Sequence, residues 1–244
     1  MNYVTLGHTT NGWAGRSEQT DLGFQALVDL LRFAYDQGIT FFDSADQYGS
    51  HPHLREALRS GIDRDHVTIL TKTTSRGEKE TWQDLHRYLR ELGTDRLDIV
   101  LLHCMTSASW NRTHAGAMAA LSQARSKGLV RAVGVSCHDY GALQTAAREP
   151  WVEFVLARIN PAGDLMDGSV EQIVAVLTEI HDQGKAVCGM KALARGGLRP
   201  QARLALRYVL ELPCVDAVTV GMMHRQEVLQ NLEALEELHR PKAA

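Results

Sequence analysis

The chain of 244 residues alternates along its length between strand-like and helix-like segments. Short apolar runs rich in β-branched and aromatic residues, such as 39–43 and 97–102, are typical of buried strands. Between such runs, apolar residues recur at helical spacing, as over 27–34, and this gives the intervening segment one apolar face. The alternation predicts an α/β protein built from repeated strand–helix units.

The ends of the predicted strands repeat at a nearly constant distance. They fall at Asp43, Lys72, His103, Ser136, Asn160, Lys191 and Gly221, so successive ends are 29, 31, 33, 24, 31 and 30 residues apart. With a weak first strand at 4–6, the chain has eight such units. Eight consecutive units in roughly 250 residues close into a (β/α)8 barrel, the TIM barrel. The rival, an open doubly wound sheet, carries G-x-G-x-x-G in its dinucleotide-binding form, and the sequence lacks that motif. We therefore predict one (β/α)8 barrel domain over residues 1–244.

Composition and charge narrow the class of protein further. Apolar residues make up 44% of the chain and charged residues 23%, which is ordinary for a globular protein. A net charge of −3 gives no basic surface for nucleic acid or for an anionic membrane. No stretch of the sequence approaches the roughly 18 apolar residues of a membrane span. Four widely spaced cysteines fit a reducing compartment, so we expect a cytoplasmic protein with no nucleic-acid or membrane partner.

Three successive strands of the predicted barrel end in polar side chains. Asp43, Lys72 and His103 follow strands two, three and four, and Tyr48 stands one short loop beyond the aspartate. In a closed barrel these ends meet at the C-terminal rim, where barrel enzymes carry their catalytic residues. Each residue alone also has a structural interpretation, as a helix cap or a hydrogen-bonded rim residue, so the prediction depends on the four together.

These four side chains suit the protonation of a carbonyl oxygen. A tyrosine near its reference pKa of about 10 is a poor acid at neutral pH, and a buried lysine cation beside it lowers that pKa. Asp43 would keep Lys72 charged, and His103 would hold a substrate carbonyl by a hydrogen bond. No side chain supplies hydride, so carbonyl reduction at this site implies a nicotinamide cofactor.

Several segments resemble the aldo-keto reductase superfamily, of which this chain would be a short, divergent member. They are 42–49 (FDSADQYG), 70–72 (LTK), 95–103 (DRLDIVLLH), 133–136 (VGVS) and 220–231. The resemblance implies a barrel oxidoreductase that uses NAD(P)H to interconvert an aldehyde, ketone or sugar carbonyl and the alcohol. It implies Tyr48 as the proton donor, with Lys72 and Asp43 as the pair that tunes it. His103 would position the carbonyl.

The resemblance also implies which residues hold the cofactor. They are Asp43, Ser136, Cys137, Lys191, Gly221, Met222, Arg225, Glu227 and Asn231. Cys137 departs from the family pattern, since an asparagine usually holds the nicotinamide amide there, and Ala157 takes the place of a strand-six glutamine with the same task. Glu227 would repel the 2′-phosphate of NADPH and accept a hydrogen bond from a free 2′-hydroxyl. The expected cofactor is NADP or NAD, with a tilt toward NAD.

The altered cofactor positions leave a second hypothesis open, in which the barrel keeps the catalytic residues but acts as a binding or regulatory protein. For the substrate pocket of a small-molecule carbonyl we expect Trp13, Tyr48, His103 and Trp110.

Two weaker motifs have both a functional and a structural interpretation. Arg195, with the glycines that follow it, offers a cation and backbone amides to a phosphate, and it also fits a flexible loop. The pair His51 and His53 begins a predicted helix, where histidines are usually surface residues. A metal-dependent hydrolase would need ligands on several strand ends, which are not evident, so we expect no metal site.

Overall fold

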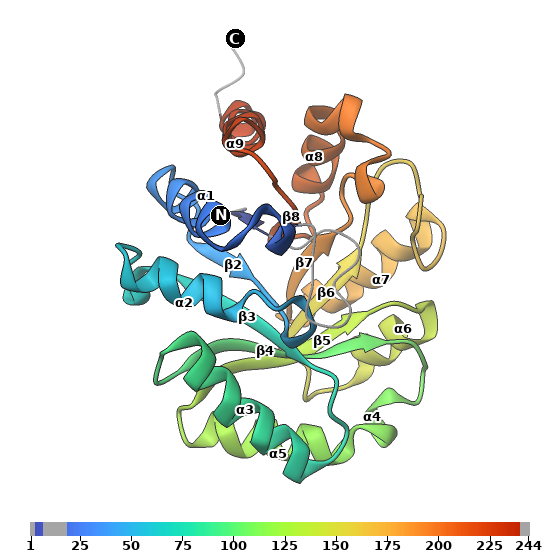
Figure 1. Ribbon diagram of the computed structural model, residues 1–244. Coiled ribbons are helices and arrows are strands. Elements are labelled where there is room, and N and C mark those ends of the chain that lie inside the picture. Colours follow the sequence, from blue (N-terminus) through green and yellow to red (C-terminus); the bar gives the residue numbers. More distant parts are fainter. Residues whose placement is uncertain (1–2, 7–18, 240–244) are drawn as a thin grey trace.

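The computed structural model describes residues 3–6 and 19–239, with side chains described over 19–236. In this part of the chain, eight parallel strands form a closed barrel in which each strand pairs with the next and β8 pairs with β1 (Figure 1). The strands are β1 (Tyr3–Leu6), β2 (Phe41–Asp43), β3 (Thr68–Thr73), β4 (Leu97–Met105), β5 (Val130–Cys137), β6 (Phe154–Arg158), β7 (Ala186–Met190) and β8 (Ala217–Val220). The predicted (β/α)8 barrel is confirmed.

Helices follow the strands and cover the outside of the barrel (Figure 1). They are α1 (Phe24–Asp36), α2 (His51–Arg59), α3 (Glu78–Leu92), the short α4 (Trp110–Thr113), α5 (Ala115–Ser126), α6 (Tyr140–Arg148), α7 (Val170–Asp182), α8 (Ala202–Glu211) and α9 (Arg225–His239). The apolar stripe of a helix is the face that packs inward, as shown by the buried Leu27, Leu30, Leu31 and Ala34 of α1. The layer between strands and helices therefore forms the larger part of the core.

Alternate strand residues point into the barrel, where they form a separate apolar cluster. It consists of Phe41, Leu70, Ile99, Leu101, Phe154, Leu156, Cys188, Met190 and Ala217. Because side chains alternate between the two faces of a strand, the next inward positions lie two residues further along. On β2, β3 and β4 these positions are Asp43, Lys72 and His103. The strand pattern thus places the three side chains above the apolar floor of the barrel.

Two glycines meet specific demands of the backbone. A Cβ atom at Gly134 on β5 would lie 1.8 Å from the Phe154 carbonyl oxygen, so only glycine allows β5 and β6 to approach so closely there. Gly93 ends α3 in the left-handed conformation, with φ of 65°, and its N–H bonds to the Leu89 carbonyl oxygen. This sharp helix end leads the chain directly into β4.

The end of β4 differs from the prediction. The sequence pattern ends this strand at His103, but β4 continues to Met105, with a shift of register against β5 after Leu102. Cys104 adopts a left-handed backbone conformation with φ of 63°, which accommodates the irregularity. Within the described ranges, no helix is both long enough and apolar enough to cross a membrane.

Candidate active site

A buried ion pair lies at the C-terminal mouth of the barrel. Lys72, whose side chain is fully buried, pairs with Asp43 and donates a hydrogen bond to the Ser44 carbonyl oxygen at 2.7 Å. The other carboxylate oxygen of Asp43 accepts a hydrogen bond from the Thr219 hydroxyl at 3.0 Å. Because both oxygens of Asp43 have partners, the carboxylate has a defined orientation toward the lysine.

The phenol ring of Tyr48 lies beside both Lys72 and His103. Tyr48 ends the short 3₁₀ helix η2 (Asp46–Tyr48), and the Lys72 ammonium nitrogen is 4.8 Å from its ring centroid. The ring of His103 meets it edge to face, with 5.7 Å between the ring centroids and 81° between the ring planes. The four side chains that the sequence singles out as catalytic therefore come together.

Burial outweighs the lysine charge in setting the acidity of Tyr48. Loss of solvent raises the pKa of the hydroxyl and Lys72 lowers it, and the net pKa lies above the usual value of 10.0. The prediction that the Lys72 cation lowers this pKa is wrong, because burial destabilises the charged tyrosinate more than the cation stabilises it. For Lys72, burial lowers the pKa, but the attraction of Asp43 and Tyr48 exceeds that effect and the pKa is raised. At neutral pH the site therefore holds a protonated phenol beside an ammonium cation.

A cavity of about 540 Å³ opens beside these side chains and extends to α9. It is lined by Asp43, Tyr48, Leu156, Met190 and Thr219 at the barrel mouth, by Lys191, Arg195 and Arg199 after β7, and by Gly221, Met223, Glu227 and Asn231 near α9. Its volume lies within the range of small-molecule and cofactor sites. The sequence singles out most of the polar lining, but no pattern pointed to Arg199, and Thr219 is recognisable only from the alternation along β8.

The segment after β7 makes one part of this cavity cationic. Lys191 has a left-handed backbone, with φ of 60°, and burial together with the charge of Arg195 lowers its pKa to about 8. Arg199 forms an ion pair with Glu227, which joins this segment to the first turn of α9. Such an arrangement of ammonium and guanidinium groups suits an anionic ligand group such as a phosphate.

Strand register corrects two predictions for the barrel end of the cavity. Cys137 is fully buried in the layer between barrel and helices, where burial raises its thiol pKa far above the usual value. Ala157 faces the same layer, whereas Leu156 pairs with Ser136 and lines the cavity. The hydroxyl of Ser136 accepts a hydrogen bond from the Cys104 N–H at 2.8 Å. The strand-six side chain at this place is therefore Leu156, and the predictions for the side chains of Cys137 and Ala157 are wrong.

Two predicted cofactor residues near α9 also point elsewhere. The side chain of Met222 is buried in the core, and its carbonyl oxygen accepts a hydrogen bond from the Gln19 amide at 2.8 Å. The guanidinium of Arg225 lies 5.0 Å from the ring centroid of Phe33 on α1, so it packs away from the cavity. Met222 precedes α9 and Arg225 begins it, and successive residues there point in different directions. Sequence spacing alone does not show which of these side chains faces the cavity.

The tryptophans proposed for the substrate pocket give one correction. Trp110 is 1% exposed, and its indole N–H donates a hydrogen bond to the Ala142 carbonyl oxygen at 3.1 Å. It packs in the layer outside the barrel, so the prediction that it lines the pocket is wrong. Trp13 lies outside the described residues.

The histidine pair of α2 is buried rather than exposed. His51 bonds to Thr71 and Glu91 through its two ring nitrogens, and the ring of His53 lies 4.7 Å from that of Phe24. Across the described side chains, no group of three histidine, cysteine, aspartate or glutamate residues is arranged to hold a metal ion.

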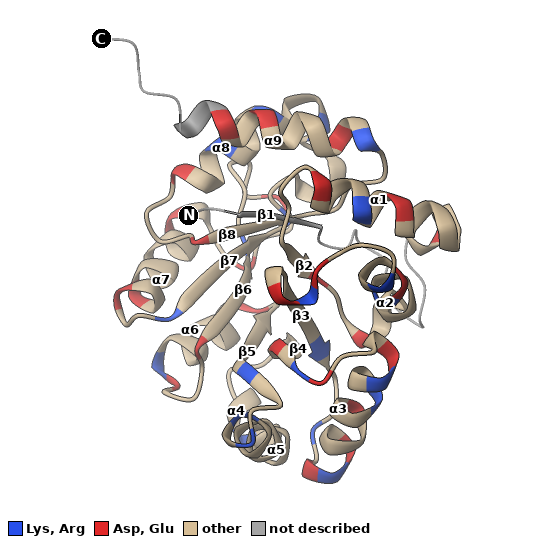
Figure 2. Cartoon of the chain, turned by 90° about the vertical axis from the view of Figure 1, so that its left-hand side faces the viewer, with Lys and Arg blue, Asp and Glu red and all other residues tan. Residues whose placement is uncertain are grey.

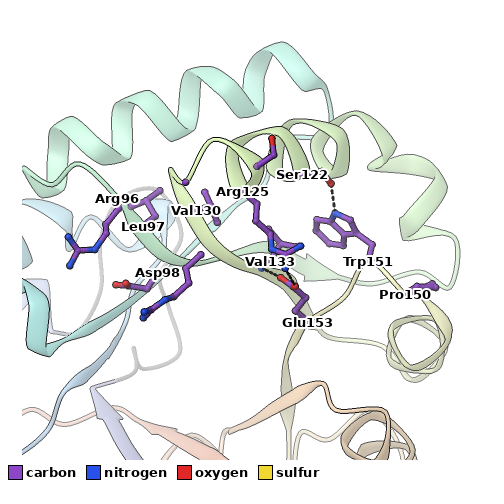
Figure 3. Close-up of a pocket in the computed structure, with 13 residues that line it drawn as sticks. Arg96, Leu97, Asp98, Ser122, Arg125, Val130, Val133, Pro150, Trp151 and Glu153 are labelled. Carbon is purple, nitrogen blue, oxygen red and sulfur yellow. Dashed lines mark hydrogen bonds and ion pairs between the residues drawn. The ribbon is translucent and has the colours of Figure 1, made fainter.

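A second cavity, of about 630 Å³, lies near the N-terminal ends of β4 and β5, at the end of the barrel away from the mouth (Figure 3). It contains an ion pair of 2.6 Å between Arg125 and Glu153 and a hydrogen bond of 2.9 Å from the Trp151 indole to Ser122. None of the predicted catalytic residues lines it. The cavity at the barrel mouth is therefore the candidate active site.

Comparisons with known proteins agree with this architecture. The family model described as the aldo/keto reductase family matches residues 4–201. The 2,5-diketo-D-gluconic acid reductase B of Corynebacterium sp. (strain SHS752001) is 32% identical over 229 residues, which cover 92% of this chain and 75% of that protein. An uncharacterized oxidoreductase of Schizosaccharomyces pombe is 29% identical over 129 residues, which cover 50% of this chain and 44% of that protein. The chain thus matches less than half the length of this second relative.

Solved structures share the fold. An aldo/keto reductase from Klebsiella pneumoniae, in complex with NADP and acetate, has a TM-score of 0.75 at 23% identity, over 96% of this chain and 85% of that chain. A Pseudomonas aeruginosa chain assigned to the aldo-keto reductases has a TM-score of 0.79 at 22% identity, over 97% of this chain and 90% of that chain. With a family model that matches most of the sequence and a barrel that carries the expected side chains at its mouth, the chain belongs to the aldo/keto reductase family.

Proposed function

We propose that the protein is an NAD(P)-dependent oxidoreductase that interconverts a small carbonyl compound and its alcohol. The observation that carries the proposal is the position of Tyr48, which lies against Lys72 and His103 and lines the cavity at the barrel mouth. A protonated phenol next to a buried cation can release its proton to a substrate oxygen as that oxygen gains negative charge. Membership of the family and the cationic end of the cavity support a nicotinamide dinucleotide as the second reactant.

Each catalytic side chain has a distinct task in this proposal. Tyr48 holds the proton at its hydroxyl and donates it to the carbonyl oxygen. The tyrosinate left behind is stabilised by the Lys72 cation, which Asp43 keeps charged and in place. His103 donates a hydrogen bond to the carbonyl oxygen and orients it. In the reverse direction the same tyrosinate accepts the proton of the alcohol. The cofactor, when bound, supplies or accepts the hydride.

The cavity lining fits such a cofactor in its chemistry. Apolar Leu156 and Met190 lie at the catalytic end, where a flat nicotinamide ring would need an apolar surface. Lys191 and Arg195 would hold the pyrophosphate by charge. Asn231, on α9, lines the cavity at the end away from the catalytic side chains, where its amide would bind the adenine.

Preference for NAD over NADP depends on Glu227. One oxygen of its carboxylate pairs with Arg199, and the other accepts a hydrogen bond from the Met223 N–H at 2.7 Å. A 2′-phosphate would need to displace the carboxylate from Arg199 and would be repelled by it. The free 2′-hydroxyl of NAD carries no such penalty, so we propose that NAD(H) is preferred.

One observation favours the second candidate, a barrel that binds ligands without efficient turnover. The strand-six residue at the catalytic end of the cavity is Leu156, whose side chain offers no hydrogen bond to a nicotinamide amide. Loss of such a bond weakens the positioning of the ring. This would leave a carbonyl-binding or regulatory protein with intact catalytic side chains.

Titration with NADH and with NADPH, followed by protein fluorescence, tests the proposal and separates the two candidates. We expect at least one nucleotide to bind with a dissociation constant below the millimolar range and to be consumed when small aldehydes or ketones are added. Failure of both nucleotides to bind at millimolar concentration would contradict the oxidoreductase. Binding without turnover across a panel of aldehydes, ketones and sugars would favour the second candidate.

A further inference from the structure

A polar network on the outer side of β3 reaches both the loop that carries Tyr48 and the strand that carries Lys72. Its central residue is Arg87 on α3, a helix along which acidic and basic residues mix (Figure 2). The guanidinium of Arg87 donates to both carboxylate oxygens of Asp46, at 2.5 and 2.8 Å. Asp46 begins the 3₁₀ helix η2, two residues before Tyr48. This two-bond contact fixes both the distance and the angle of the carboxylate.

The guanidinium is itself held on α3. It pairs with Asp84 at 2.8 Å and with Glu91 at 3.1 Å. The hydrogen bonds with Asp46, and then those with Asp84 and Glu91, raise the pKa of Arg87, so it keeps its charge. Asp84 also accepts hydrogen bonds from the hydroxyls of Thr73 and Ser75 just beyond Lys72, at 2.6 and 2.7 Å. Arg87 is therefore a fixed point rather than a mobile surface side chain.

The network continues from Glu91 to the strand. Glu91 bonds to one ring nitrogen of the buried His51 at 2.7 Å, and the other ring nitrogen bonds to the Thr71 hydroxyl at 2.8 Å. Thr71 precedes Lys72 on β3. The hydroxyl of Tyr88 also donates to the Lys72 carbonyl oxygen, at 3.3 Å. From the outer side of β3, the network thus reaches both the segment that carries the proposed proton donor, Tyr48, and the strand that carries Lys72.

Exposure shows what the contact between Arg87 and Asp46 contributes. Their side chains are 37% and 23% exposed, and ion pairs this accessible add little to folding stability. Position is different, because Asp46 and Tyr48 belong to the same short 3₁₀ helix, so a shift of Asp46 also displaces the backbone that carries the phenol. A displacement of about 1 Å at a reacting group can cost on the order of 100-fold in rate.

We propose that Arg87 is a positioning residue, which acts through Asp46 to hold the Tyr48 hydroxyl against Lys72. The proposal rests on the function proposed above. Loss of the contact should lower kcat by roughly 10- to 100-fold, since the phenol is misplaced in the transition state. The KM of the carbonyl and the dissociation constant of the nucleotide should change less than about threefold, because Arg87 does not line the cavity at the barrel mouth.

The variants are Arg87→Ala, Arg87→Lys, Asp46→Asn and the double variant Arg87→Ala/Asp46→Asn. Arg64→Ala is the matched control, since Arg64 also makes several bonds, to Asp98, Val67 and Arg96, at the other end of the barrel. We expect Arg87→Ala and Asp46→Asn to lower kcat equally and the double variant to be no worse, which shows that they act as one unit. Arg87→Lys should recover part of kcat, because lysine keeps the charge but not the two-bond geometry.

A readout that needs no turnover is the ¹⁹F NMR signal of Tyr48 in protein labelled with 3-fluorotyrosine, assigned with Tyr48→Phe. We expect Arg87→Ala to shift or broaden this signal and Arg64→Ala to leave it in place. If the wild-type protein shows no turnover, the proposed function fails while the NMR signal still decides the positioning role. An unmoved Tyr48 signal, a kcat within twofold of wild type, or an equal kcat loss in Arg64→Ala would overturn the inference.

Discussion

Replacement of Lys72 by methionine tests the buried ion pair at the centre of the site. The side chain of Lys72 is 0% exposed and that of Asp43 is 5% exposed, so Lys72→Met leaves a buried carboxylate without its cation. Breaking a buried pair in this way costs about 3–5 kcal/mol of folding free energy. The hydrogen bond from Thr219 to Asp43 remains and compensates in part, so we expect a loss of about 3 kcal/mol.

A double-mutant cycle separates this electrostatic cost from packing. Asp43→Asn in the Lys72→Met background removes the unpaired charge and keeps an oxygen that accepts from Thr219. We expect the double variant to recover most of the lost stability in urea denaturation, while carbonyl reduction stays absent because no cation stabilises the tyrosinate. A loss below about 1 kcal/mol in Lys72→Met, or a double variant less stable than the single one, would refute this account of the pair.

Three further predictions concern other parts of the protein. Glu227→Gln should improve NADPH binding relative to NADH by roughly three- to tenfold, because Arg199 is released to bind a 2′-phosphate; paired titrations of both nucleotides measure it. Lys191 has a pKa of about 8 and is charged below that pH, so the dissociation constant of NADH should rise as pH increases above about 8, and this dependence should vanish in Lys191→Arg. Trp110→Phe should lower the free energy of unfolding by about 1–3 kcal/mol, since the indole hydrogen bond to the Ala142 carbonyl and part of the buried packing are lost, and should leave KM for the carbonyl unchanged. A raised KM or a lowered kcat in Trp110→Phe would show that this residue does line the pocket.

The barrel could be predicted because several independent features of the sequence repeat with the strand–helix unit. Apolar runs, helical stripes and terminal glycines such as Gly93 all give the same element boundaries. The catalytic cluster could be predicted for the same reason. Asp43, Lys72 and His103 each lie at or near the C-terminal end of a strand, and parallel strands in a barrel end at one rim.

The other predicted site residues depend on whether a side chain points into the cavity or into the outer layer. The spacing of residues in the sequence does not decide this direction. Cys137 and Ala157 face the outer layer because each is one residue out of phase with an inward neighbour, so a shift of one residue exchanges the two faces. Trp110 stands in an apparent loop that folds into a short helix. Burial sets the pKa of Tyr48 above its usual value, and the degree of burial is a property of the packed structure.

Tyr48→Phe tests the central claim most directly, because it removes only the hydroxyl that is proposed to carry the proton. The dissociation constant of the reduced nucleotide should stay within about twofold of wild type, since nucleotide binding uses the other parts of the cavity. Single-turnover reduction of a carbonyl substrate should fall by roughly 100- to 10,000-fold, the range for loss of a general acid. Retention of more than about a tenth of the wild-type rate would contradict the claim that Tyr48 is the proton donor.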